Sequence, residues 1–164
     1  MTDQTQILQQ RLQDDLRTAM RSGDTVARET IRFLLSAYRN AEIENRSGVT
    51  ARPENERGLS AEQEIALLQR QVKQRSESIE QFQAAGRSDL VEKERGQLAV
   101  IERYLPAQLS DDELGDLVGA AVSESGATTI RDMGKVMAVL LPRVAGRADG
   151  RRVSEAVRAR LTAG

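Results

Sequence analysis

The stretch SAEQEIALLQRQVKQRSESIEQF, residues 60–82, decides the fold class. Ser60 and Gln63 have the spacing of a capping box, in which each side chain bonds the other's backbone N–H at a helix start. Apolar residues then recur close to a heptad pattern, at Ile65, Leu68, Val72, Ile79 and Phe82. This stripe covers barely three heptads, so it favours an antiparallel helical hairpin or bundle over a long coiled coil.

Helical patterns continue on both sides of this stretch. Two amphipathic helices precede it, separated by Gly23, and a fourth helix follows Gly86 and is expected to end at Pro106. Residues 46–59 show no periodicity and contain glycine and proline, which predicts a mobile loop.

The segment Leu105-Pro106-Ala107-Gln108-Leu109 is the best domain boundary. After it, Ser110 and Glu113 form a second capping-box pattern. Three more apolar stripes follow, of which the middle one is expected to end at Pro142. No strand pattern occurs. The sequence therefore predicts an all-α protein, with an antiparallel helical hairpin bundle over residues 1–105 and a small three-helix module over residues 107–164.

The composition excludes several kinds of catalytic site. The chain has no Cys and no His, so it lacks thiolate nucleophiles, imidazole bases and the usual zinc ligands. We therefore expect a binding or accessory protein with no catalytic residues, cofactor or metal of its own. The amino-terminal residues are polar, and no apolar run approaches the roughly 20 residues of a membrane span. These features predict a cytoplasmic protein with no membrane partner.

Charge is distributed unevenly along the chain. The net charge is −1, but residues 1–125 carry a net of −6 and residues 126–164 a net of +5. A basic tail suggests an anionic partner. The alternative is that the tail docks on the acidic body of the same protein.

The candidate nucleic-acid-binding residues all lie in this tail: Arg131, Lys135, Arg143, Arg147 and Arg151. Three of them surround the turn Gly146–Gly150, which leads into a helix whose first N–H groups favour an anion. We interpret the set as phosphate-backbone contacts. The alternative is a structural turn in which Asp149 caps the last helix and occupies the anion position itself.

A second basic cluster lies in the third helix, at Arg70, Lys73 and Arg75. Arg75 interrupts the apolar stripe, so it either extends its charged end to solvent, lines a groove or pairs with a neighbour such as Glu102.

Met133 and Met137 are interpreted as core residues. The acidic residues near Ser110 are explained by the helix start rather than by a metal site.

Several short motifs, in a fixed order and spacing, resemble the GatB/YqeY family. They are KQRS (73–76), SIEQF (78–82), AGRSDL (85–90), YLPAQLS (104–110), DMGKVM (132–137), LPRV (141–144) and GRADG (146–150). The similarity runs from about Leu8 to Leu161, and the chain is most similar to the stand-alone, YqeY-like members.

The resemblance implies a function related to the carboxy-terminal tail domain of GatB, a component of the tRNA-dependent amidotransferase. That enzyme amidates misacylated Glu-tRNA(Gln) or Asp-tRNA(Asn), and its tail helps to hold the tRNA. We therefore expect a tRNA-associated accessory protein, with tRNA, the amidotransferase or an aminoacyl-tRNA synthetase as partners. Two alternatives remain: a protein-interaction module of a cytosolic complex, or an amidotransferase-like carbon–nitrogen ligase with glutamine as amido donor, active only with partners.

Overall fold

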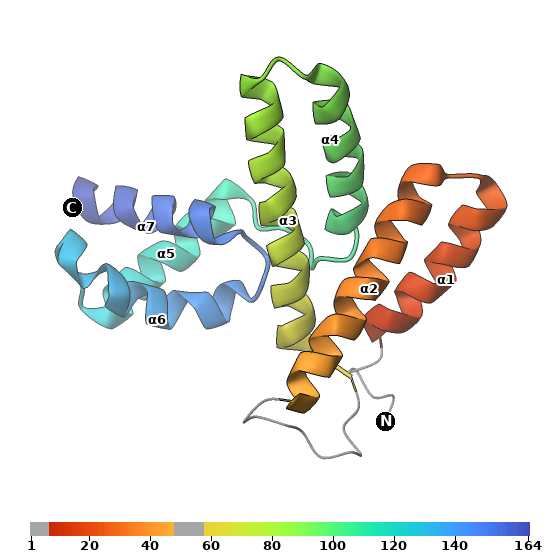
Figure 1. The fold of residues 1–164 in the computed structure, drawn as a ribbon. Coiled ribbons are helices and arrows are strands. Elements are labelled where there is room, and N and C mark those ends of the chain that lie inside the picture. The colour runs from red at the N-terminus through yellow and green to blue at the C-terminus, as the bar shows by residue number, and fades with distance from the viewer. Residues whose placement is uncertain (1–6, 48–57) are drawn as a thin grey trace. The chain divides into compact units, whose positions relative to one another are not determined.

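The structure, a computed structural model, describes residues 7–47 and 58–164. Within these ranges every regular element is helical and there is no strand, which confirms the all-α class predicted from the apolar stripes. The elements are α1 (Ile7–Ser22), α2 (Thr25–Ser47), α3 (Ala61–Ala84), α4 (Ser88–Glu102), α5 (Asp111–Ser125), the short 3₁₀ helix η2 (Ile130–Asp132), α6 (Met133–Val144) and α7 (Gly150–Ala163) (Figure 1). The predicted loop 46–59 falls mostly outside the described residues, although its first two residues belong to α2.

The chain divides into two compact units, Met1–Leu105 and Pro106–Gly164. The first unit consists of two antiparallel hairpins, α1 with α2 and α3 with α4, and α2 also packs against α4 and α3 (Figure 1). Its core is formed by the apolar stripes of the four helices, in which Leu12, Leu34, Tyr38 and Ile101 are fully buried. That residues 1–105 and 107–164 are separate domains stays a prediction.

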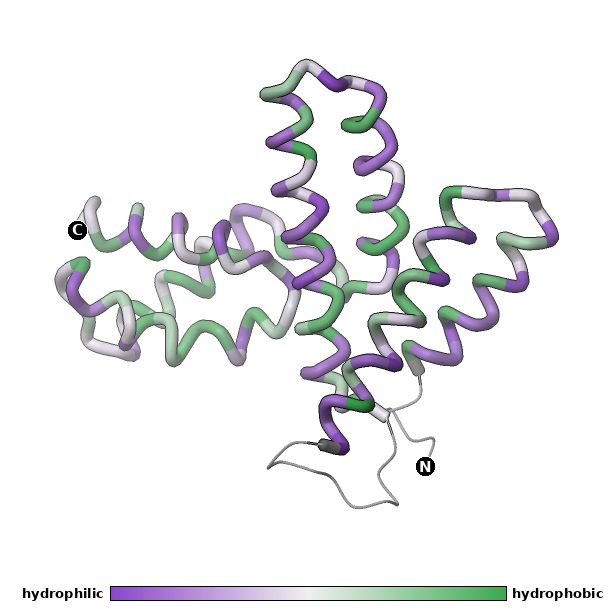
Figure 2. The backbone as a smooth tube through the Cα atoms, in the orientation of Figure 1, coloured by the Kyte–Doolittle hydropathy of each residue, from purple (hydrophilic) through white to green (hydrophobic). Residues whose placement is uncertain are grey.

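The second unit packs α5, η2, α6 and α7 around a core of its own. Its most buried side chains are aliphatic, among them Val118, Val136, Leu140 and Val157. Along most helices of both units, hydrophobic and hydrophilic segments follow one another at the helical period, as burial of one helical face requires, whereas α6 is mostly hydrophobic (Figure 2).

Both predicted capping boxes are present. The Ser60 hydroxyl accepts a hydrogen bond from the Gln63 backbone at 3.2 Å, and the Gln63 side chain accepts one from the Ser60 backbone at 2.9 Å. Ser110 and Glu113 exchange the same two bonds at the start of α5. These contacts satisfy N–H groups that have no partner inside the helix, so the two helices begin where the sequence predicts.

Two predicted helix ends are wrong. Pro142 does not end α6, which continues to Val144, because Val144 fills the core of its unit. The helix stops after Val144 because the next two residues, Ala145 and Gly146, both adopt positive φ. Helix α4 ends at Glu102, before the expected stop at Pro106, because the chain tightens there through a bond from Tyr104 N–H to Ile101 O at 3.0 Å.

Candidate functional site

The structure does not bring the five predicted nucleic-acid-binding residues together at one place. Arg131 lies in η2 and Lys135 in the first turn of α6, whereas Arg143 lies in the last turn of α6. A helix of 12 residues is about 18 Å long. Arg147 follows in the middle of the connection between α6 and α7, and Arg151 lies in the first turn of α7. The predicted set is therefore two groups, because Lys135 and Arg143 lie eight residues, or about 12 Å, apart along α6.

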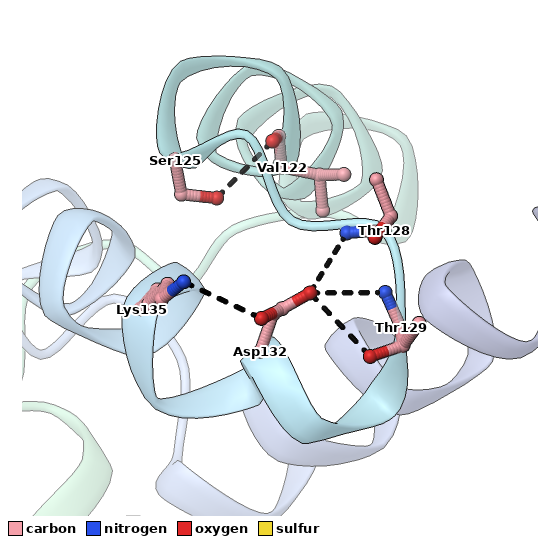
Figure 3. Close-up of polar contacts among 6 residues, drawn as sticks. All are labelled: Val122, Ser125, Thr128, Thr129, Asp132 and Lys135. Atoms are coloured by element: carbon pink, nitrogen blue, oxygen red, sulfur yellow. Dashed lines mark hydrogen bonds and ion pairs between the residues drawn. The ribbon is translucent and has the colours of Figure 1, made fainter.

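Within the first group, Lys135 contacts the turn between α5 and α6 through Asp132 (Figure 3). Lys135 Nζ lies 3.5 Å from a carboxylate oxygen of Asp132. The other oxygen of Asp132 accepts hydrogen bonds from the backbone N–H groups of Thr128, at 3.0 Å, and Thr129, at 3.1 Å. These two bonds hold the pKa of Asp132 below its usual value, with a smaller contribution from Lys135. Asp132 thus shapes the turn, and Lys135 is its exposed ion-pair partner.

The second group also has partners inside its own unit. Arg143 forms an ion pair with Glu124 of α5, and Arg151 Nε lies 3.2 Å from a carboxylate oxygen of Glu155. Arg147 Nε donates to the Ala107 carbonyl at 3.1 Å. These contacts tie the basic side chains to neighbouring parts of the same unit.

The turn Gly146–Gly150 has the structural role that the sequence left open as an alternative. Asp149 is the N-cap of α7, and its carboxylate accepts a hydrogen bond from the Arg152 backbone N–H at 2.9 Å. The position where an anion would sit at this helix start is therefore occupied by Asp149. The Arg152 guanidinium reaches Asp111 of α5 at 2.7 Å.

We expect Asp149→Ala to lower the free energy of unfolding by about 1 kcal/mol, because it removes an N-cap acceptor. Thermal denaturation followed by circular dichroism measures the change. Glu155→Ala is the matched control, since it removes only the exposed pair with Arg151 and is expected to change stability by less than about 0.5 kcal/mol. Equal effects of the two substitutions would contradict the capping role.

The charge asymmetry of the sequence disappears in the folded units. Helix α5 has five acidic and no basic residues, and it belongs to the same unit as the basic tail. The unit Pro106–Gly164 therefore carries eight basic and eight acidic residues. The ion pairs of Arg143 with Glu124 and of Arg152 with Asp111 join the tail to α5. The basic tail is thus largely balanced by α5.

The second basic cluster lies on α3, where Arg70 and Lys73 are exposed and Arg75 is half-buried. Arg75 pairs with Glu94 of α4 at 3.3 Å, and its guanidinium carbon lies 5.1 Å from the ring centre of Phe33 in α2. Of the three alternatives that the sequence left open for Arg75, pairing with a neighbour is the one found, but the suggested partner, Glu102, is wrong. Lys73 makes an exposed contact with Glu77 at 3.9 Å. Arg75 thus joins three helices, while Lys73 stays on the surface.

An apolar surface that the sequence reading missed runs along η2 and α6. Ile130 and Leu141 are 45% and 49% exposed, and Met133 and Met137, between them in sequence, are partly buried against the core. We call these four residues the η2–α6 apolar face. A signal was present in the sequence: α6 has only two charged residues, Lys135 and Arg143, and so is more apolar than one buried stripe requires.

The described residues contain no group of three or more His, Cys, Asp or Glu side chains that could hold a metal ion. In the same ranges, no helix is both long enough and apolar enough to cross a membrane.

The chain is similar to known proteins over most of its length. The model of a family described as "Yqey-like protein" matches residues 9–161. "Altered inheritance of mitochondria protein 41, mitochondrial" of Pyrenophora tritici-repentis is 39% identical over 144 residues, which cover 84% of this chain and 71% of that protein. The protein of the same name in Eremothecium gossypii is 34% identical over 71% of this chain and 60% of its own length. The protein of the same name in Saccharomyces cerevisiae YJM789 is 33% identical over 94 residues, which cover 57% of this chain and 46% of that protein. The chain thus spans less than two thirds of the last two relatives.

These comparisons overturn two predictions. The expected tRNA-associated accessory function is wrong, because the relatives are named for the inheritance of mitochondria and not as amidotransferase tails. The cytoplasmic location, and with it the cytosolic setting of the protein-interaction alternative, is contradicted by the word "mitochondrial" in the relatives' names. The tRNA expectation came from the resemblance to the GatB tail domain, and the tail charge that agreed with it is balanced by α5 within the same unit.

Proposed function

The chain belongs to the YqeY-like protein family, and from that premise we propose that it is a protein-binding helical protein. In this proposal it takes part in the process for which its fungal relatives are named, the inheritance of mitochondria. It acts by holding a helix of a partner protein on the η2–α6 apolar face.

The exposure of Ile130 and Leu141 carries this proposal. Residues 130, 133, 137 and 141 are spaced by three and four, so in a helix they follow one side. Methionine side chains adapt to different apolar partners, and exposed apolar residues gathered on one side are typical of protein interaction sites. An amphipathic helix that lays its own apolar stripe on this face is the partner that such a shape favours.

Exposed basic residues next to the η2–α6 apolar face favour a partner that carries an acidic residue. Arg131 follows Ile130 directly and is exposed, with no ion pair to the described residues. Lys135 is exposed as well, and its contact with Asp132 spans 3.5 Å, a weak surface pair. We therefore propose a partner helix that places an acidic residue beside one end of its apolar stripe, opposite Arg131.

Complementation in yeast tests the proposed function. The chain, joined to a mitochondrial targeting sequence, is expressed in a Saccharomyces cerevisiae strain that lacks its own relative. We expect the unmodified chain to restore mitochondrial inheritance. Leu141→Glu and Ile130→Glu are expected to abolish the rescue, because each places a charge inside the apolar contact with the partner.

Ile43→Glu is the matched control, because Ile43 is also an exposed large apolar residue, 53% exposed, but lies on α2 in the other unit. It is expected to rescue as the unmodified chain does. Circular dichroism and protein level establish that all variants fold and accumulate equally. Rescue by Leu141→Glu, or failure of the unmodified chain where the strain's own relative succeeds, would contradict the proposal.

A further inference from the structure

The first turn of α3 carries a buried carboxyl group that the proposed function does not use. Glu64 is 8% exposed, among the least exposed charged residues of the first unit. Its carboxylate accepts a hydrogen bond from the hydroxyl of Tyr38 on α2 at 3.4 Å. The same hydroxyl accepts one from the backbone N–H of Leu59 at 3.1 Å. Leu59, Tyr38 and Glu64 thus form a chain of hydrogen bonds that joins α2 to the start of α3.

A second polar contact lies beside these hydrogen bonds, and neither of its two side chains titrates. The side-chain amides of Asn45, on α2, and Gln63, on α3, exchange two hydrogen bonds of 3.0 Å each. Gln63 also completes the capping box with Ser60. The start of α3 is therefore fixed to α2 by polar groups, and the Glu64 carboxyl is the group among them whose charge changes near neutral pH.

The groups around Glu64 act on its ionisation in opposite directions. Burial disfavours the carboxylate and is the largest effect; the hydrogen bond from Tyr38 and the charge of Arg11, on α1, favour it. The result is a pKa raised to about 7. Burial, together with the charges of Glu64 and Glu42, also raises the pKa of Tyr38, so its hydroxyl stays protonated and can donate.

We propose that Glu64 and Tyr38 form a proton-dependent latch between α2 and the start of α3. With the carboxyl protonated, the latch holds Leu59 and the first turns of α3 against α2. Ionisation places a charge in a largely dry site and weakens the contact. The device is independent of the η2–α6 apolar face, because it lies in the other unit.

The direction of the pH effect follows from proton linkage. When the latch opens, Glu64 enters water and its pKa returns to an ordinary value near 4.5. Between this value and about 7, the closed state keeps a proton that the open state releases, so rising pH favours opening. The closed state is most stable at low pH, loses stability as pH rises through this window, and changes little above about pH 8.

Hydrogen exchange of the Leu59 amide measures the latch directly, because this N–H donates to Tyr38. We expect its protection factor, corrected for the intrinsic pH dependence of exchange, to fall by one to two orders of magnitude (~10–100-fold) between pH 5 and pH 8. In Glu64→Gln, which keeps the shape and a hydrogen-bond acceptor but cannot ionise, protection is expected to stay constant over this range.

Glu62→Gln is the control, because Glu62 is an exposed residue of the same helical turn and should leave the fall in protection unchanged. The unmodified protein provides a second measurement that needs no variant: the side-chain carboxyl carbon of Glu64 should titrate near 7 in a carbon NMR experiment. Titration near 4.5, or an equal fall in protection in Glu64→Gln, would overturn the latch.

Discussion

Leu140→Ala is expected to lower the free energy of unfolding of the carboxy-terminal unit by about 2–5 kcal/mol and to leave the amino-terminal unit unchanged. Leu140 is fully buried in the core of the unit Pro106–Gly164, so its removal leaves a cavity there. Leu12, fully buried in the core of the amino-terminal unit, is the matched position. Leu12→Ala should destabilise the amino-terminal unit and leave the carboxy-terminal unit unchanged.

Two spectroscopic probes separate the units. The chain has two tyrosines and no tryptophan, and Tyr38 and Tyr104 both lie in the first unit, so tyrosine fluorescence follows that unit alone. Circular dichroism follows both. Leu140→Ala should shift a transition seen by circular dichroism and leave the fluorescence transition in place, whereas Leu12→Ala should shift the fluorescence transition. A fluorescence transition moved equally by Leu140→Ala would contradict two independently folding units.

Glu94→Ala is expected to lower the free energy of unfolding by about 3 kcal/mol, because it leaves the Arg75 guanidinium largely buried without its carboxylate. The side chains of Arg75 and Glu94 are only 19% and 14% exposed. Arg75 Nε already has no hydrogen-bond partner, and without Glu94 the guanidinium keeps the contact with the Phe33 ring but loses its carboxylate. Chemical denaturation followed by circular dichroism measures the loss.

The double variant Arg75→Leu with Glu94→Leu should recover most of this loss, because apolar side chains of similar volume can replace a buried ion pair. Glu77→Ala is the control: it breaks the exposed pair with Lys73 on the same helix and should change stability by less than about 1 kcal/mol. If Glu94→Ala changes stability no more than Glu77→Ala does, the buried pair does not stabilise the junction of α2, α3 and α4.

The features predicted correctly from the sequence depend on residues close together in the chain. The capping boxes of Ser60 and Ser110 each involve a partner three residues away, and the apolar stripes need only the helical period. The partner of Arg75 depends instead on how α3 and α4 align in their hairpin. Glu102 lies eight residues beyond Glu94, about 12 Å further along α4, and so cannot reach Arg75.

The expectation of an anionic partner for the basic tail used charge alone, without the packing that brings α5 to the tail. The charge count divided the chain at residue 125, inside a folded unit, and so separated the acidic α5 from the basic residues that it pairs with. The exposure of Leu141 depends on which side of α6 the other helices of the unit cover. The sequence shows that α6 is unusually apolar, but only the packing of α5, α6 and α7 shows which apolar residues stay exposed.

Photocrosslinking from position 141 tests the central claim most directly. The chain, targeted to yeast mitochondria, carries a photoreactive amino acid in place of Leu141 or, as control, of Ile43, and the crosslinked peptide is identified by mass spectrometry. The account predicts that position 141 crosslinks to one protein segment, with apolar residues at helical spacing and an acidic residue at one end. Arg131→Glu should reduce that crosslink, and position 43 should not form it. Crosslinking of position 141 to RNA, to no partner, or to the same segments as position 43 would contradict the proposed binding face.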